Sequence, residues 1–241
     1  MNPFGAYPSD LQKEAETGLR GLVFDIDGVM LDSRASNMAF YNLIRRMLRL
    51  PPLSPAEEEY CHMASVDEAM LHIIPPAHRE AAWEACRKID YSGQILPLLS
   101  VEPGLREILR WLKRQRVKLA IFTNRSSTVN ELLRHFDLED FFDPVVTVSD
   151  YPPKPSPDGL LGILKIWNEK PGNIAFLGDS KVDEQAARGA GVPFWSFRNQ
   201  DLPARLHFNG FFNMMELIPP LVETPRQEPT RHACQATEED T

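Results

Sequence analysis

Short apolar runs alternate with amphipathic stretches along most of this chain. Residues 21–27, 117–122 and 173–177 are dominated by apolar side chains, a pattern typical of strands buried on both faces of a parallel sheet. Residues 145–148 and 192–196 are weaker versions of the same pattern. Apolar residues recur at helical spacing between these runs. We therefore predict an α/β fold, a doubly wound parallel sheet with helices on both faces.

Residues 34–100 interrupt this alternation and carry only helical patterns. Ser-x-x-Glu capping boxes begin two predicted helices at Ser54 and Ser65, and a third box is predicted at Thr128, outside this stretch. We predict a helical bundle inserted after the first strand, so that residues 19–33 and 101–221 form the core. Residues 1–18 and 222–241 are polar and bury too little apolar surface to offset their ordering entropy, which predicts a mobile extension and a disordered tail.

Charge and composition exclude several classes of function. Twenty-six basic and 34 acidic residues give a formal net charge of −8, which disfavours nucleic acid as a partner. No segment approaches the roughly 18 uninterrupted apolar residues of a membrane span, and the polar first residues lack the apolar core of a secretion signal. The three cysteines are odd in number and match no zinc pattern. We expect a cytoplasmic protein that binds neither nucleic acid nor membrane.

Polar residues with useful chemistry follow several of the predicted strands. Asp25 and Asp27 lie two positions apart after the first apolar run, so both point to the same side at the carboxyl end of a strand. Ligands bind at that end in open α/β sheets, and two carboxylates there need a positive partner such as a divalent cation. An ordinary Asp-Gly turn after a strand fits this pair equally well.

Three further segments strengthen the functional reading. Thr123 and Asn124 end the second strand with a hydroxyl and an amide that suit an anion. Lys154 lies in a proline-rich loop, although a lysine in such a loop is usually a solvated surface residue. Asp179 follows another strand, with Asp183 one helical turn further on, a pair that could also simply complement a helix N-terminus.

Four segments together resemble a known set of motifs. Their sequences are FDIDGVMLDS (24–33), FTN (122–124), KPSPDG (154–159) and GDSKVD (178–183). In this order they are similar to the four motifs of the haloacid dehalogenase superfamily, over nearly the whole chain apart from its ends. The helical insertion resembles the cap domain of the subgroup that contains phosphoglycolate phosphatase and β-phosphoglucomutase.

The resemblance implies a role for each motif residue. Asp25 would be the nucleophile that becomes an aspartyl-phosphate, and Asp27 would protonate the leaving alcohol and then activate water. Mg²⁺ would bind carboxylate oxygens of Asp25 and Asp179 and the backbone carbonyl of Asp27. Asp183 would orient a water or the catalytic lysine.

The remaining motif residues are implied to handle the phosphoryl group. Thr123 and the backbone of Asn124 would hold its oxygens, while Lys154 would bind the phosphate and offset the negative charge. Asp27 distinguishes the chain from dehalogenases and phosphonatases, both of which lack this aspartate. Phosphonatases also need a cap lysine, and Lys88 is the single lysine within residues 34–100.

Specificity residues are harder to assign within the helical insertion. His62 lies where related caps carry a specificity loop, although a structural role is the more common use of such a histidine. Arg45 and Arg49 are predicted to share one helix face, where they would either meet a second anionic group of the substrate or be solvated.

The sequence therefore favours an Mg²⁺-dependent phosphatase for a small phosphorylated metabolite such as 2-phosphoglycolate, as a monomer or small homo-oligomer. A sugar-phosphate mutase would use the same core. Mutases of this subgroup, however, carry an arginine at the position of Val66 and a histidine at that of Asn37. A non-catalytic protein that binds phosphate or a partner is the third alternative.

Overall fold

A parallel sheet forms the centre of the protein. The computed structural model describes residues 18–126 and 128–222, and for residues 62 and 63 it describes the backbone alone. The strands of the sheet are β1 (Gly21–Phe24), β4 (Lys118–Phe122), β5 (Val145–Val146), β6 (Ile174–Gly178), β7 (Phe194–Phe197) and β8 (Leu206–Phe208). They are ordered β5-β4-β1-β6-β7-β8, and every neighbouring pair is parallel. β1 therefore lies between β4 and β6, and the carboxyl ends of these three strands meet.

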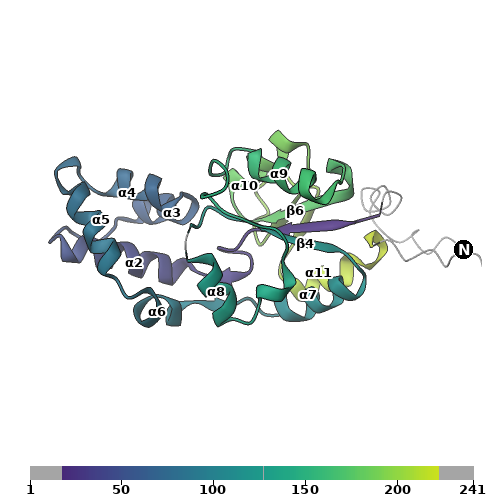
Figure 1. Ribbon diagram of the computed structural model, residues 1–241, viewed down its shortest axis with the longest axis horizontal. Coiled ribbons are helices and arrows are strands. Elements are labelled where there is room, and N and C mark those ends of the chain that lie inside the picture. Colours follow the sequence, from purple (N-terminus) through teal and green to yellow (C-terminus); the bar gives the residue numbers. More distant parts are fainter. Residues whose placement is uncertain (1–17, 127, 223–241) are drawn as a thin grey trace, which may run out of the picture.

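Helices cover both faces of the sheet (Figure 1). One face carries α7 (Leu105–Arg114), α8 (Val129–His135) and α11 (Phe211–Leu217), and the other carries α9 (Asp158–Trp167) and α10 (Lys181–Ala190). Alternate residues of β1 supply the two hydrophobic clusters, with Leu22 and Phe24 in one and Val23 in the other. This arrangement confirms the predicted α/β fold with a doubly covered parallel sheet.

A separate group of helices lies beyond the carboxyl end of the sheet and is called the helical unit here (residues 34–99; Figure 1). It consists of α2 (Arg34–Met47), α3 (Pro55–Met63), α4 (Val66–Ile73), α5 (Arg79–Lys88) and α6 (Tyr91–Gln94). A third hydrophobic cluster, which includes Tyr41, Ile44 and Met70, packs its interior. The antiparallel pair β2 (Leu31–Asp32) and β3 (Ser100–Val101) joins the unit to the core. That this unit acts as a cap stays a prediction.

Short 3₁₀ helices complete the described chain: η1 (Pro76–His78), η2 (Leu96–Leu98), η3 (Glu139–Phe141), η4 (Pro171–Asn173) and η5 (Pro219–Leu221). The capping boxes predicted at Ser54 and Ser65 are both formed. The box predicted at Thr128 is not formed. Its acidic partner, Glu131, accepts a hydrogen bond from the hydroxyl of Ser92 in the helical unit. A hydrogen bond between Ser92 of the helical unit and Glu131 of the core thus replaces the predicted local cap at Thr128.

The two ends of the described chain meet next to the amino end of β1. Leu19 and Val222 form a parallel bridge, and Val222 is buried, so the ordered core extends one residue beyond the predicted limit at 221. The predictions for the first 17 and last 19 residues lie outside the described part of the chain. Among the described residues, no helix combines the length and apolar character needed to cross a membrane.

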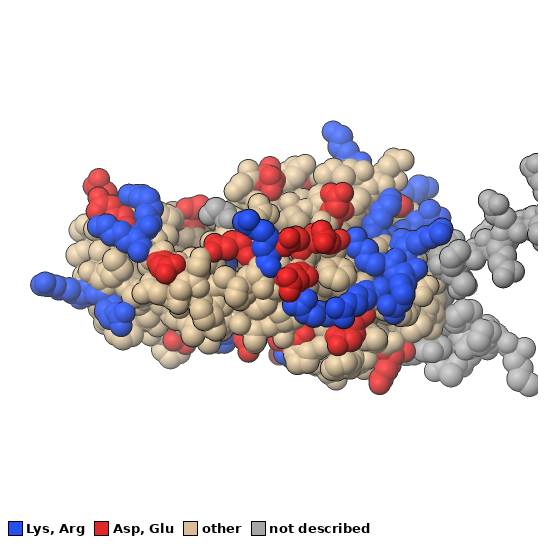
Figure 2. Space-filling model, turned by 60° about the horizontal axis from the view of Figure 1, so that its bottom comes forward, with Lys and Arg blue, Asp and Glu red and all other residues tan. Residues whose placement is uncertain are grey.

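Lys and Arg side chains form a group at one end of the core on one face of the molecule. On the face shown in Figure 2, this group lies at the end distant from the helical unit. Helix α7, which lies on this face, carries exposed Arg110, Lys113 and Arg114.

Candidate active site

The predicted site residues come together at the carboxyl ends of three adjacent strands. Asp25 follows β1, Thr123 follows β4 and Asp179 follows β6. Since β1 pairs with both other strands in parallel, the chain must deliver these side chains to one edge. Lys154 reaches the same edge from the loop before α9 and forms an ion pair with Asp25, with 2.7 Å between its Nζ and Oδ1.

Asp25 lies in an environment that opposes its negative charge. Asp25 is only 6% exposed, and the pKa of its carboxyl group is raised from 3.8 to about 7, chiefly by burial. The ammonium group of Lys154 opposes this rise, whereas the neighbouring carboxylates of Asp183 and Asp27 contribute to it. Lys154 alone does not restore the ordinary acidity of Asp25, so the site favours an additional positive charge.

Lys154 is held between two carboxylates. Its Nζ lies 2.7 Å from Asp25 Oδ1 and 2.6 Å from Asp183 Oδ1, and 5.6 Å from the ring centroids of both Phe122 and Phe176. Although burial acts to lower the pKa of this ammonium group, Asp183 and Asp25 raise it above its ordinary value. Lys154 is therefore a permanently charged group in a fixed position.

Two side chains fix the segments on either side of this lysine. Asn124 Oδ1 accepts a hydrogen bond from the backbone N–H of Lys154 at 2.8 Å, and Asn124 Nδ2 donates to its carbonyl at 3.3 Å. Asp183, which is fully buried, accepts from Lys154 with one oxygen and from the backbone N–H and hydroxyl of Ser180 with the other. The side chain of Asn124 thus fastens the lysine loop, and Asp183 orients the lysine.

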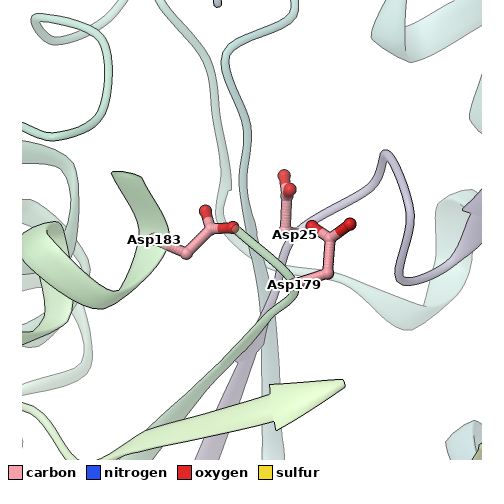
Figure 3. Close-up of side chains that lie close together, drawn as sticks. All are labelled: Asp25, Asp179 and Asp183. Atoms are coloured by element: carbon pink, nitrogen blue, oxygen red, sulfur yellow. The ribbon is translucent and has the colours of Figure 1, made fainter. Parts of the chain in front are cut away.

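The carboxylates of Asp25, Asp179 and Asp183 converge on one small space. One oxygen from each lies within 4.8 Å of the others, and Figure 3 shows the three groups, from the segments just after β1 and β6 and from α10. Burial raises the pKa of Asp179 well above its ordinary value, with Asp183 and Asp25 adding to the effect. Repulsion of this kind is relieved by a hard divalent cation, so the donor set fits Mg²⁺.

Gly28 makes this convergence sterically possible. Its φ of +76° belongs to the left-handed region that favours glycine, and a Cβ at this position would lie 2.0 Å from Asp179 Oδ2.

Because both oxygens of Asp183 already accept hydrogen bonds, from Lys154 and Ser180, Asp25 and Asp179 are the better carboxylate ligands for a cation.

Arg125, which the sequence analysis did not select, binds Asp27 directly. Its Nε donates to Asp27 Oδ2 at 2.7 Å and its Nη2 to Oδ1 at 2.6 Å, a bidentate ion pair. Nη1 donates to the hydroxyl of Tyr91 at 2.7 Å, and Nη2 also lies 3.4 Å from Asn37 Oδ1. Burial acts to lower the pKa of this guanidinium, but Asp27 and Tyr91 raise it above its ordinary value.

This cluster joins the core to the helical unit, because Arg125 belongs to the core while Asn37 lies on α2 and Tyr91 on α6. The signal for it was present in the sequence, as Arg125 directly follows Thr123 and Asn124. An arginine in a loop usually reaches solvent, and only the tertiary structure shows that this one turns inward.

A cavity of about 410 Å³ lies between the site and the helical unit. Its core side includes Asp25, Thr123 and Lys154, and its other wall includes apolar side chains of the helical unit such as Phe40 and Trp83. Thr123 is almost fully buried, and its Oγ1 accepts a hydrogen bond from the backbone N–H of Arg125 at 3.2 Å. The hydroxyl hydrogen of Thr123 can therefore be directed to a bound anion.

Neither of the two arginines suggested for specificity lines this cavity. Arg45 is 7% exposed and bonds to Glu57 at 2.8 Å and to the carbonyl oxygens of Pro51 and Ile73 at 2.6 and 3.1 Å. It stabilises the interior of the helical unit, which corrects the expectation that it meets a substrate anion or is solvated.

Arg49 and His62 give no support for that prediction either. Helix α2 ends at Met47 and Arg49 has a φ of +58°, so the predicted shared helix face is wrong. Arg49 is exposed and lines a different cavity, on the outside of the helical unit. His62 lies in α3, but its side chain is outside the described part of the structure.

Comparisons with known proteins agree with the four motifs. A family model described as haloacid dehalogenase-like hydrolase matches residues 22–197. A phosphoglycolate phosphatase of Chromobacterium violaceum is 31% identical over 183 residues, which cover 72% of this chain and 82% of the relative. One of Pseudomonas putida is 38% identical over 184 residues, covering 72% and 67%.

A solved structure agrees in fold and in sequence. The crystal structure of a HAD-superfamily hydrolase, subfamily IA, variant 1, from Geobacter sulfurreducens superposes with a TM-score of 0.69 at 36% identity. The match covers 83% of this chain and 96% of that one. The resemblance inferred from the motifs is confirmed.

Proposed function

We propose, from the premise that this chain belongs to the haloacid dehalogenase-like hydrolase family, that it is an Mg²⁺-dependent phosphatase acting through an aspartyl-phosphate on Asp25. Family membership makes the chain an enzyme of the phosphatase type, whereas the metal, the intermediate and the substrate are the proposal. The observation that carries it is the contact of Asp25 with Lys154 at 2.7 Å beside Asp179, at the floor of a cavity.

In the first step a carboxylate oxygen of Asp25 attacks phosphorus and the bond to the ester oxygen breaks. Lys154 and the hydroxyl of Thr123 hold the phosphoryl oxygens and offset the charge that develops on them. Because Asp183 and Asn124 already fix Lys154, little reorganisation is needed when the substrate binds.

Asp25, Asp179 and the backbone carbonyl of Asp27 would hold Mg²⁺. When bound, the ion supplies positive charge that favours the ionised form of Asp25 and offsets the phosphoryl charge. The high pKa that burial gives Asp25 is the observation that this role explains.

Asp27 supplies and removes protons. It donates a proton to the departing ester oxygen in the first step, then takes a proton from the water that attacks the aspartyl-phosphate, and phosphate leaves. Both oxygens of Asp27 are bonded to Arg125 in the present arrangement, which favours the ionised carboxylate. Asp27 must therefore give up one of these contacts and take up a proton before it can protonate the ester oxygen.

Hydrolysis is favoured over phosphoryl transfer between sugar positions. Asn37 lies 3.5 Å from Asp27, at the position where the resembling mutases carry a histidine, and Val66 lines the cavity without a charge. We propose a small phosphorylated metabolite as the substrate and the cytoplasm as the location. Two relatives named phosphoglycolate phosphatase support including 2-phosphoglycolate among the esters tested.

The test is phosphate release from a panel of phosphomonoesters, with Mg²⁺ and with EDTA. We expect hydrolysis that EDTA abolishes and Mg²⁺ restores. Mass spectrometry of an Asp27→Asn variant after brief incubation with substrate should locate an added phosphoryl group on Asp25. Phosphate release from no ester, or a phosphoryl group on a different residue, would contradict the proposal.

A further inference from the structure

Arg125 has the properties of a residue that recognises a second anionic group of the substrate. Among the described residues that line the cavity, three carry a permanent positive charge: Arg87, Arg125 and Lys154. Lys154 forms ion pairs with Asp25 and Asp183, and Arg87 is exposed to solvent. The side chain of Arg125 is only 11% exposed and adjoins the residue assigned to the ester oxygen.

The guanidinium of Arg125 already holds a carboxylate in the geometry used for recognition. Two of its N–H groups donate to the two oxygens of Asp27 at 2.7 and 2.6 Å. Planar bidentate pairing of this kind is specific for carboxylate and phosphate groups, and a hydroxyl cannot reproduce it. Asp27 thus demonstrates that a carboxylate fits this part of the cavity.

Other contacts hold Arg125 in place independently of Asp27. Nη1 donates to the hydroxyl of Tyr91, and its backbone is bonded to Thr123 Oγ1 on one side and to the N–H of Val148 on the other. The guanidinium can therefore keep its position when Asp27 turns away, which leaves a preorganised cationic site.

The reaction requires such an exchange of partners. A general acid has to approach the ester oxygen to about 2.6–3.2 Å, while both oxygens of Asp27 are bonded to Arg125. A substrate carboxylate on the carbon next to the ester oxygen would lie within reach of the same guanidinium. It could take over both N–H donors as Asp27 takes up a proton and turns to the ester oxygen, so that the buried positive charge is never left unpaired.

We propose that Arg125 is the specificity-determining residue, and that the substrates are phosphomonoesters with a carboxylate on the esterified carbon. This inference rests on the proposed phosphatase function. A neutral alkyl phosphate offers no partner for Arg125, so Asp27 stays bonded to it. Among the described residues of the wall that contains Phe40 and Trp83, none supplies a further buried cation for a larger polyanion.

The experiment compares 2-phosphoglycolate with 2-hydroxyethyl phosphate, which has the same carbon skeleton but an alcohol in place of the carboxylate. In the unmodified protein with Mg²⁺ we expect kcat/KM to favour 2-phosphoglycolate by about 100-fold or more. Arg125→Gln should remove most of this preference by lowering kcat/KM for 2-phosphoglycolate. Arg125→Lys, which keeps the charge but loses the bidentate pairing, should retain part of it. Arg87→Gln, the matched control, should leave the preference in place.

A binding measurement makes the test independent of turnover. Calorimetry with an Asp25→Asn variant should show tighter binding of 2-phosphoglycolate than of 2-hydroxyethyl phosphate, and adding Arg125→Gln should abolish the difference. Should Arg125→Gln fail to fold, the same comparison is made with Arg125→Lys, where a reduced difference supports the inference and an unchanged one overturns it.

The outcomes separate this inference from the proposed function. Hydrolysis of both esters at equal kcat/KM, or a preference that depends on Arg87 instead, overturns the role of Arg125 and leaves the phosphatase standing. Phosphate release from neither of these esters nor any other ester in the panel overturns the proposed function itself.

Discussion

The two walls of the cavity differ in chemical character: one is charged and the other is mainly apolar. The core wall consists of charged groups that hold one another in place, with Lys154 between Asp25 and Asp183 and Arg125 on Asp27. The facing wall from the helical unit is mainly apolar and is shaped by hydrophobic packing. Polar contacts cross between them at few points, one of which is the hydroxyl of Tyr91.

The difference teaches why the charged groups that perform the chemistry lie on the core wall. Fixed charges in a dry site can stabilise a charged transition state without reorganisation, but they are costly to bury and have to compensate one another. Apolar packing has no such requirement and can change shape without disturbing the core. Four predictions test this contrast, beginning with the largest effect.

Replacing Asp25 by Asn should reduce kcat at least roughly 1,000-fold, because the amide is a poor nucleophile and a poor metal ligand. Steady-state phosphate release measures the loss, and circular dichroism checks that the fold is retained. Asp67→Asn removes an exposed carboxylate of the helical unit and serves as the control. Similar losses in both variants would erase the distinction between the two walls.

Lys154→Met should lower the free energy of unfolding by about 3–5 kcal/mol, because it leaves the buried carboxylates of Asp25 and Asp183 without their shared cation. Urea unfolding without Mg²⁺ measures this change. Lys181→Met removes an exposed lysine at the start of α10 and should change the midpoint little. Equal midpoints for both variants would show that the buried cation does not stabilise the core.

Stability should depend on pH and on Mg²⁺ together. The pKa of Asp25 is raised from 3.8 to about 7, so between these values the folded state binds a proton that the unfolded state has released. The free energy of unfolding of the metal-free protein should therefore fall as pH rises through this window, by at most a few kcal/mol. Mg²⁺ requires the ionised carboxylates, so it should raise the Tm more at pH 8 than at pH 5.

Thermal unfolding at the two pH values, with and without Mg²⁺, measures this coupling. Asp179→Ala should lose most of the Mg²⁺ effect, and it should weaken the pH trend of the metal-free protein because the pKa of Asp179 is raised as well. An equal Tm increase at both pH values would mean that the ion does not compete with protons at this site.

Arg45→Met should have the smallest effect, a loss of about 2 kcal/mol in stability with KM almost unchanged. The reason is that Arg45 forms hydrogen bonds within the helical unit and does not line the cavity between this unit and the core. Arg46→Met replaces its exposed neighbour on α2 and is the matched control for urea unfolding. A raised KM with unchanged stability would restore the idea that Arg45 binds substrate.

Much of the fold followed from the pattern of apolar residues. The three long buried strands were predicted because each is an apolar run, and three of the four motifs lie at the ends of these strands. β8 and the β2–β3 pair were missed, since strands of two or three residues are defined by their partners and carry little pattern of their own.

Three arginines show that the sequence alone does not determine which partner a long charged side chain binds. Arg45, Arg49 and Arg125 have the same side chain, and the first two were selected for the site because of their predicted spacing on a helix. The structure buries Arg45 against Glu57, leaves Arg49 exposed and turns Arg125 onto Asp27. A guanidinium on a long flexible stem can reach many partners, so spacing along the chain does not determine which one it binds.

The sequence by itself determined the parallel sheet and the edge at which Asp25, Thr123 and Asp179 meet. Periodicity and strand ends are local properties, and parallel pairing then forces these ends together. Only the tertiary structure decided that Arg125 binds Asp27 and that Tyr91 of the helical unit supports it. Such contacts join residues 34 to 98 positions apart, and they depend on burial and packing that no local pattern records.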